Sequence, residues 1–117
     1  MNAGQAGSPL RVFYRDYAAA VSISSAQPEV LARDRVAPLA ERLLRDADNF
    51  VGVVDASDAI LQCYRSDGRD RVTLELVYPE ASGCLRLTLS REGALAILKN
   101  LPDNFDETLL QGGQYID

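Results

Sequence analysis

The sequence predicts an α+β fold, in which a four-stranded antiparallel β-meander over about residues 50–90 is covered on one face by N-terminal helices and one C-terminal helix. Two observations support this prediction. Between residues 50 and 90, apolar and polar residues alternate in short runs separated by turn-forming residues, which is typical of strands with one buried face. On either side of this region, apolar residues recur every three or four positions, as they do along amphipathic helices.

Helices are predicted before the meander. Ser8-Pro9 has the cap-and-proline pattern of a helix start, and the helical spacing continues to about residue 20 or 22. Pro28 opens a second helical pattern. Pro38 is expected to break this pattern near residues 36 and 37, because an interior proline removes a backbone hydrogen bond. A fresh helix is then predicted to end near residues 48 and 49.

Phe13, Tyr14 and Tyr17 form an aromatic stripe on the first predicted helix. Two interpretations stay open at this point. The stripe either packs in the core, or forms the seam of a homodimer if the helix projects from the domain.

The predicted strands are 50–54, 59–64, 72–78 and 85–89, joined by turns rich in Asp, Ser, Gly and Pro. Polar side chains from three adjacent strands share the outer face: Gln62, Tyr64, Thr73, Glu75, Arg86 and Thr88. We expect Glu75 and Arg86 to form a cross-strand ion pair. The outer face is either a solvated surface or a flat docking surface with Tyr64 as its anchor, since tyrosine and arginine are frequent at interface hot spots.

A closing helix is predicted for residues 91–100, with Ser90 as its cap and Pro102 as its stop. Residues 103–110 form either one more turn or a short edge element. The whole is expected to be a single domain over residues 9–111, with a flexible leader at 1–8 and a loose tail at 112–117.

The composition argues against most catalytic and metal chemistry. The chain contains no histidine, which is the commonest general acid/base and metal ligand near neutral pH. Its glycines match neither the phosphate-loop nor the dinucleotide-binding spacing. We therefore expect no enzyme, no catalytic residue, no metal site and no cofactor. An enzyme would have to use carboxylates, tyrosine or arginine.

Cys63 and Cys84 are predicted on opposite faces of the sheet, out of reach of a disulfide, and reduced as in an intracellular protein. The amino end lacks the basic start and apolar core of a signal peptide. Apolar runs are all shorter than the roughly 20 residues of a membrane span. The expected location is the cytoplasm, away from membranes.

The formal net charge of −5 argues against nucleic-acid binding, which requires cations against phosphates. No basic residue follows Lys99, whereas Asp103, Asp106 and Glu107 lie in that segment. These acids are either a solvated surface or an electrostatic contact for a basic partner protein.

Residues 48–62 carry two resemblances. The run from Asp48 to Asp55, followed by a turn and Ile60-Leu61-Gln62, resembles small bacterial immunity-type proteins that neutralise secreted toxins. The resemblance covers about half the chain. It implies an amino-terminal helix, a strand pair, further strands, a closing helix and occlusion of a toxin without catalytic residues. The hairpin at 53–61 also resembles the opening of PAS-type sensor domains, but too few residues follow for the helices that line a PAS pocket.

The expected function is stoichiometric protein binding by a small acidic domain, as an immunity-type or accessory protein. The candidate partner-binding residues are Gln62, Tyr64, Glu75, Arg86, Asp103, Asp106 and Glu107. The alternative is a small-ligand sensor or carrier with an apolar pocket between helices and sheet.

Overall fold

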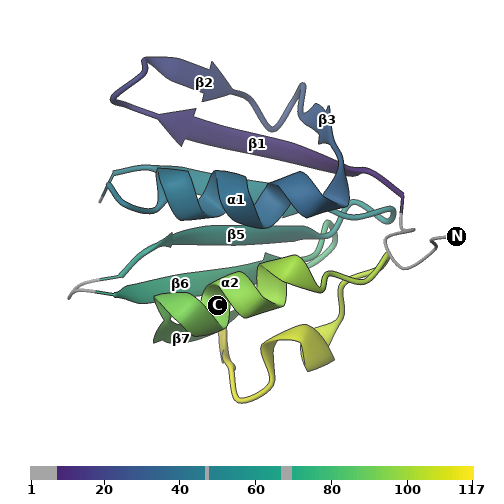
Figure 1. Cartoon of the computed structure of the whole chain (residues 1–117). Coiled ribbons are helices and arrows are strands. Elements are labelled where there is room, and N and C mark those ends of the chain that lie inside the picture. The colour runs from purple at the N-terminus through teal and green to yellow at the C-terminus, as the bar shows by residue number, and fades with distance from the viewer. Residues whose placement is uncertain (1–7, 47, 67–69) are drawn as a thin grey trace, which may run out of the picture.

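A computed structural model describes residues 8–46, 48–66 and 70–117 (Figure 1). Its elements, in chain order, are β1 (Leu10–Asp16), β2 (Val21–Ile23), β3 (Glu29–Leu31), α1 (Arg33–Leu43), β4 (Phe50–Val54), β5 (Ile60–Arg65), β6 (Arg71–Val77), β7 (Cys84–Ser90), α2 (Arg91–Lys99), the 3-10 helix η2 (Glu107–Leu110) and β8 (Gln114–Ile116).

The described strands form one eight-stranded antiparallel sheet in the order β2-β1-β4-β5-β6-β7-β8, and β3 also pairs with β1. The predicted meander is present as β4 to β7. The prediction of a four-stranded sheet flanked by several N-terminal helices is wrong, because the sheet extends beyond β4 at one edge and beyond β7 at the other.

The first predicted helix is a strand, β1. Its sequence also satisfies a period of two, with Leu10 and Val12 facing the helices and Phe13 facing the other way. Five residue pairs join β1 to β4, and this long-range ladder prevails over the local helical spacing. The amino-terminal helix implied by the immunity-type resemblance is therefore not formed, and neither is a helical dimer seam.

The second predicted helix is also wrong, since Glu29–Leu31 pairs with β1 as strand β3. The break expected at Pro38 does not occur either: α1 runs from Arg33 to Leu43 through this proline. The ring removes the bond to Asp34 but lies on the exposed side of the helix. Burial of the opposite side holds the helix together, as Val36 and Leu43 are fully buried.

The carboxyl-terminal part is closer to expectation. Helix α2 starts after Ser90, whose hydroxyl accepts a hydrogen bond from Gly93 N at 3.0 Å. Residues 107–110 form the turn η2. The tail segment contains β8, which pairs with Cys84–Arg86 of β7.

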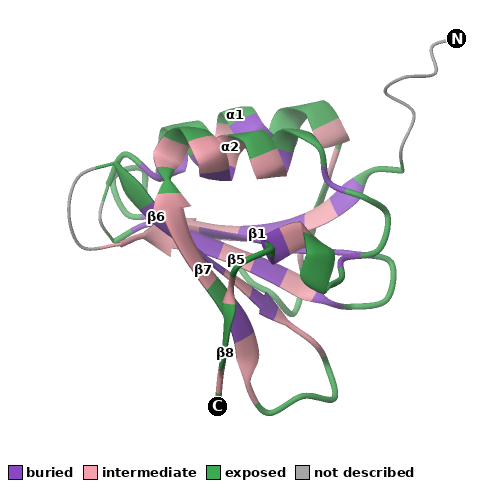
Figure 2. Ribbon diagram, turned by 90° about the horizontal axis from the view of Figure 1, so that it is seen from below, coloured by how far each residue is buried: buried purple, intermediate pink, exposed green. Residues whose placement is uncertain are grey.

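Both helices lie on the same face of the sheet (Figure 2). The core fills the layer between the helices and the sheet. It includes Val12, Val36, Ala40, Leu43, Val53, Leu61, Cys63, Leu74, Leu76, Ala94 and Leu98, together with Phe105 and Leu110 from the segment around η2. The opposite face carries no helix within the described residues. None of the described helices is long and apolar enough to cross a membrane.

Asp16 at the end of β1 links the sheet to α1. Its Oδ2 accepts a hydrogen bond from Arg42 Nη1 at 2.8 Å, and its Oδ1 accepts one from Ala19 N at 3.2 Å. The backbone hydrogen bond from Ala19, followed by the bond from Arg42, lowers the pKa of Asp16 below its ordinary value. The Asp16 side chain is 8% exposed and that of Arg42 is 57% exposed, so β1 is fixed to the helix layer by a charged contact that is shielded from water on the Asp16 side only.

Candidate functional site

The sheet face opposite the helices is the candidate site, and we call it the open face. Because side chains alternate along a strand, the paired registers define which residues share it. Its members are Arg11, Phe13 and Arg15 of β1, Phe50, Gly52 and Val54 of β4, Ile60, Gln62 and Tyr64 of β5, Thr73, Glu75 and Val77 of β6, and Cys84, Arg86 and Thr88 of β7.

Three polar side chains at the centre of this face form a bonded group, which we call the Glu75 trio. Tyr64 Oη donates a hydrogen bond to Glu75 Oε2 at 2.7 Å, and Arg86 Nε donates to the same oxygen at 2.8 Å. Arg86 Nη2 also lies 2.8 Å from Glu75 Oε2, so the predicted cross-strand ion pair is confirmed. The Glu75 side chain is only 12% exposed, whereas that of Arg86 is 42% exposed. The trio therefore presents a cation and a phenol edge to solvent, with the carboxylate beneath them.

The trio changes the acidity of its members. Burial first, and then the hydrogen bond to Glu75, raise the pKa of Tyr64 to about 12. The hydrogen bond from Arg86 to Glu75 is the main cause that raises the pKa of Arg86. Tyr64 is thus a hydrogen-bond donor over the whole physiological pH range and is not placed to act as a base.

Further polar contacts extend along the same strands. Gln62 lies between Gly52 and Glu75 in one cross-strand row. Thr73 and Thr88 share a hydrogen bond of 2.8 Å between their hydroxyls. Gln62, Tyr64, Glu75 and Arg86 are therefore brought together, as their alternation predicts.

One side of the open face is aromatic. The Phe13 ring lies across Gly52, so close that a Cβ at this position would overlap its atoms. Phe13 also packs edge-to-face on Phe50, with 6.4 Å between the ring centroids. Glycine at position 52 therefore leaves room for the Phe13 ring against the backbone of β4.

The open face carries more positive than negative charge. Three arginines project from it, Arg11, Arg15 and Arg86. They face two carboxylates, Glu75 on the face itself and Asp58 at its edge. Arg11 is held by Asp58 in the turn after β4, with 2.9 Å between Nη2 and Oδ1. Arg15 lies over the ring of Tyr17, 4.8 Å from its centroid. The sign of this face is thus opposite to the net charge of the chain.

The three candidate acids lie elsewhere. Asp103 pairs with Arg33, with 2.5 Å between Oδ1 and Nη2. Asp106 accepts a hydrogen bond from Thr108 N and caps η2, and Glu107 accepts one from Tyr115 Oη. Since η2 packs into the core on the helix side of the sheet, this acidic segment is not part of the open face.

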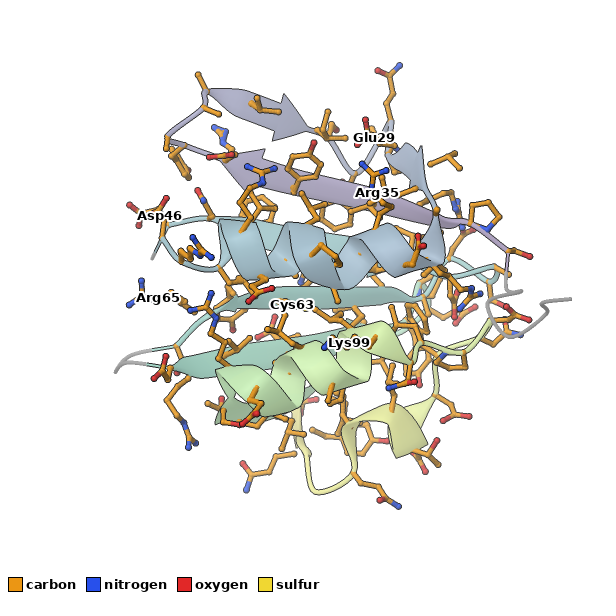
Figure 3. All side chains as sticks on the ribbon, in the orientation of Figure 1. Glu29, Arg35, Asp46, Cys63, Arg65 and Lys99 are labelled. Carbon is orange, nitrogen blue, oxygen red and sulfur yellow. The ribbon has the colours of Figure 1, made fainter. Side chains whose placement is uncertain are left out.

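The two cysteines occupy opposite faces and are not bonded to each other, as predicted. Cys63 is completely buried below the helices (Figure 3), and burial raises the pKa of its thiol. Cys84 is partly exposed on the open face, beside Val77 and Ile116. Within the described residues, no group of three or more Cys, Asp or Glu side chains is arranged to hold a metal ion.

The sequence prediction missed the β1 part of the open face. The helical spacing of Phe13, Tyr14 and Tyr17 predicts a helix at this position. The sequence nonetheless contains a signal for a strand. Apolar and charged residues alternate at the start of Leu10–Asp16, and the run contains valine, phenylalanine and tyrosine, which favour strands. Comparison of the chain with protein-family models, with curated proteins and with solved structures gave no match.

Proposed function

We propose that this chain is a non-catalytic domain that binds another protein, one copy to one, through the open face of its sheet. The observation that carries the proposal is the asymmetry of the sheet. One face is covered by two helices. The other carries no helix among the described residues and leaves Phe50, Ile60 and Tyr64 partly exposed, although Phe13, Val54 and Thr73 on it are buried by their neighbours. A partner can bind to such a partly apolar face of an antiparallel sheet and exclude water from it.

The composition of the open face suits this role. Aromatic residues and arginine are enriched at interface hot spots, and Phe50, Tyr64 and Arg86 are at least partly exposed on the open face. The Glu75 trio is already bonded before any partner arrives, so little side-chain entropy remains to be lost at its centre.

The charge of the open face favours a partner surface that carries carboxylates around an apolar centre. The expectation of a basic partner depends on Asp103, Asp106 and Glu107, which lie on the other side of the sheet. Complementary charge at the edge of an interface mainly steers association. A toxin occluded by an immunity-type protein is one form such a partner takes, supported here only by the resemblance at residues 48–62. Two unpaired thiols support a cytoplasmic location.

The small-ligand alternative requires an apolar pocket between helices and sheet. In this structure that layer is filled by side chains of 0% exposure, among them Val36, Leu43, Leu61 and Leu74. The open face therefore carries the proposed function.

The proposal is tested by one substitution on each side of the sheet. Ile60→Arg places a charge on the open face between Val54 and Val77, and the long arginine stem can lie along the surface without unfolding the sheet. Ala96→Arg adds the same side chain to the exposed side of α2 as a matched control. Each immobilised protein is used to capture partners from an extract of its native host.

We expect a partner, in equal stoichiometry, to be retained by the unmodified chain and by Ala96→Arg. Its affinity for Ile60→Arg should fall at least about tenfold, as expected for a charge introduced into a buried interface. Retention of the same proteins by all three chains, with circular dichroism spectra that match, would refute binding through the open face.

A further inference from the structure

A hollow lies at the end of the sheet near the carboxyl end of α1. Its volume is about 280 Å³, and it is lined by Leu44, Arg45, Arg65, Asp70, Arg71, Val72 and Arg91. We call it the arginine hollow. It is separate from the Glu75 trio, so nothing in this inference depends on the proposed function.

The fold assembles the arginine hollow from four elements. Arg45 follows α1, Arg65 ends β5, Arg71 begins β6 and Arg91 begins α2. Strand pairing brings them together, since Arg65 is opposite Val72 and Arg71 is opposite Ser90, the residue before Arg91. Figure 3 shows Arg65 at this end of the sheet, on the same side of the molecule as Asp46, which follows α1.

Two of the arginines have a structural contact that uses part of their capacity. Arg65 Nη1 donates to Arg45 O at 2.6 Å, and Arg91 Nη2 donates to Glu41 O at 3.0 Å. Both acceptors are carbonyls in or just after the last turns of α1, where cations are favourable. A guanidinium has five N–H donors, so each of these side chains keeps further donors for a ligand.

The other two arginines are exposed. Within residues 8–46, 48–66 and 70–117, neither the Arg45 nor the Arg71 side chain donates a hydrogen bond or forms an ion pair. Among the described residues that line the hollow, Asp70 is the one carboxylate. The described lining therefore carries four arginines against one aspartate, and a bound anion would reduce the repulsion among these cations.

We infer that the arginine hollow binds an oxyanion of the phosphate type, either free phosphate or the phosphate group of a small organic ester. Guanidinium groups match the oxygens of phosphate in paired hydrogen bonds, and they stay charged at every physiological pH. Leu44 and Val72 lie behind the same hollow but are each only 1% exposed, so the arginines are the groups that a ligand would meet there.

The test is calorimetric titration of the full chain with inorganic phosphate and with phenyl phosphate, in a chloride buffer of matched ionic strength. The double variant Arg45→Gln/Arg71→Gln removes two cations that form no hydrogen bond or ion pair with the described residues. Arg35→Gln, on the exposed side of α1, is the matched control. Asp70→Asn removes the carboxylate of the hollow.

We expect the double variant to bind phosphate at least about tenfold more weakly than the unmodified chain, since two charge-assisted contacts are lost. Arg35→Gln should bind as the unmodified chain does, and Asp70→Asn should bind more tightly because a repelling charge is gone. Tighter binding of phenyl phosphate than of inorganic phosphate would identify an ester as the ligand, and equal binding would identify the free anion.

Two results would overturn the inference. The first is a dissociation constant weaker than about 10 mM for both compounds with the unmodified chain. The second is equal affinity of the unmodified chain and the double variant, which would place the anion elsewhere. If the double variant does not fold, the change in affinity of Asp70→Asn decides the question: unchanged or weaker binding rejects the hollow.

Discussion

At the scale of single residues, Glu75 determines the form of the open face. An exposed ion pair on a sheet contributes only about 0.2–1 kcal/mol, and Arg86 is too exposed for its pair with Glu75 to exceed that range by much. The carboxylate nevertheless accepts from both Tyr64 and Arg86 on one oxygen, and it is itself largely shielded from water. Its main effect is therefore to fix where the phenol and the guanidinium lie.

Replacement of this carboxylate should change the acidity of Tyr64. In Glu75→Gln, the pKa of Tyr64 should fall from about 12 because a negative charge no longer opposes the phenolate. It should remain above 10.0, the ordinary value, because burial is the larger cause of the shift and is unchanged. Nuclear magnetic resonance of ring-labelled tyrosine over an alkaline pH series measures this for each residue.

Tyr78 is the internal control for that titration. Burial raises its pKa, and the next causes are the charges of Asp106, Glu107 and Asp55, none of which the substitution changes. A Tyr64 titration that does not move in Glu75→Gln, or one that moves together with that of Tyr78, would show that the Glu75 trio does not exist in solution.

At the scale of elements, the contact between Asp16 and Arg42 joins β1 to α1. Its contribution to stability depends on pH. The hydrogen bonds from Ala19 and Arg42 stabilise the ionised carboxylate of Asp16 in the folded protein, so the pKa of Asp16 is lower in the folded than in the unfolded state. The stabilisation is therefore complete above the unfolded pKa of about 3.9 and is lost as pH falls through the lower folded value.

Asp16→Asn should consequently be less stable than the unmodified chain at pH 7, and the difference should shrink as pH falls below about 4. Urea unfolding followed by circular dichroism at several pH values measures both free energies. A difference in stability that stays constant from pH 7 to pH 3 would mean that the carboxylate charge does not hold β1 to α1.

The same element shows where sequence reasoning reaches its limit. The strands β4 to β7 were predictable because β6 and β7 alternate clearly, β4 is a short apolar run, and recognisable turns separate the strands from one another. Strand β1 was not, because Leu10–Asp16 satisfies both a helical and a strand period, and the choice depends on pairing with β4, some 40 residues away in sequence. Helix α1 was misjudged for a related reason, since burial of Val36 and Leu43 outweighs the bond lost at Pro38.

The whole molecule has two unlike faces, and the candidate site was predictable in part. The registers of β5 to β7 correctly brought Gln62, Tyr64, Glu75 and Arg86 together. The aromatic side of the open face and the arginine hollow could not be foreseen. Both depend on strand order and on contacts between distant segments, which local periodicity does not encode.

The two cysteines report on these faces separately, and they provide a test of the whole arrangement. In the native protein, a thiol-specific reagent should modify Cys84 on the open face at least about tenfold faster than Cys63. Cys63 can react only when the core opens by local or global unfolding, because it is completely buried. Burial also raises the pKa of its thiol, which therefore stays protonated and less reactive. Mass spectrometry of digested samples over time measures each rate, and Cys84→Ser should remove only the fast reaction.

The rate at Cys84 also reports what covers the open face. It should be independent of protein concentration if the face is free, and it should fall when the captured partner is added to the unmodified chain but not when it is added to Ile60→Arg. A rate that falls as the protein alone is concentrated would identify a second copy of the chain as the occupant. Equal rates at Cys84 and Cys63 in the native protein would contradict a sheet with one covered and one uncovered face, and with it the proposed function.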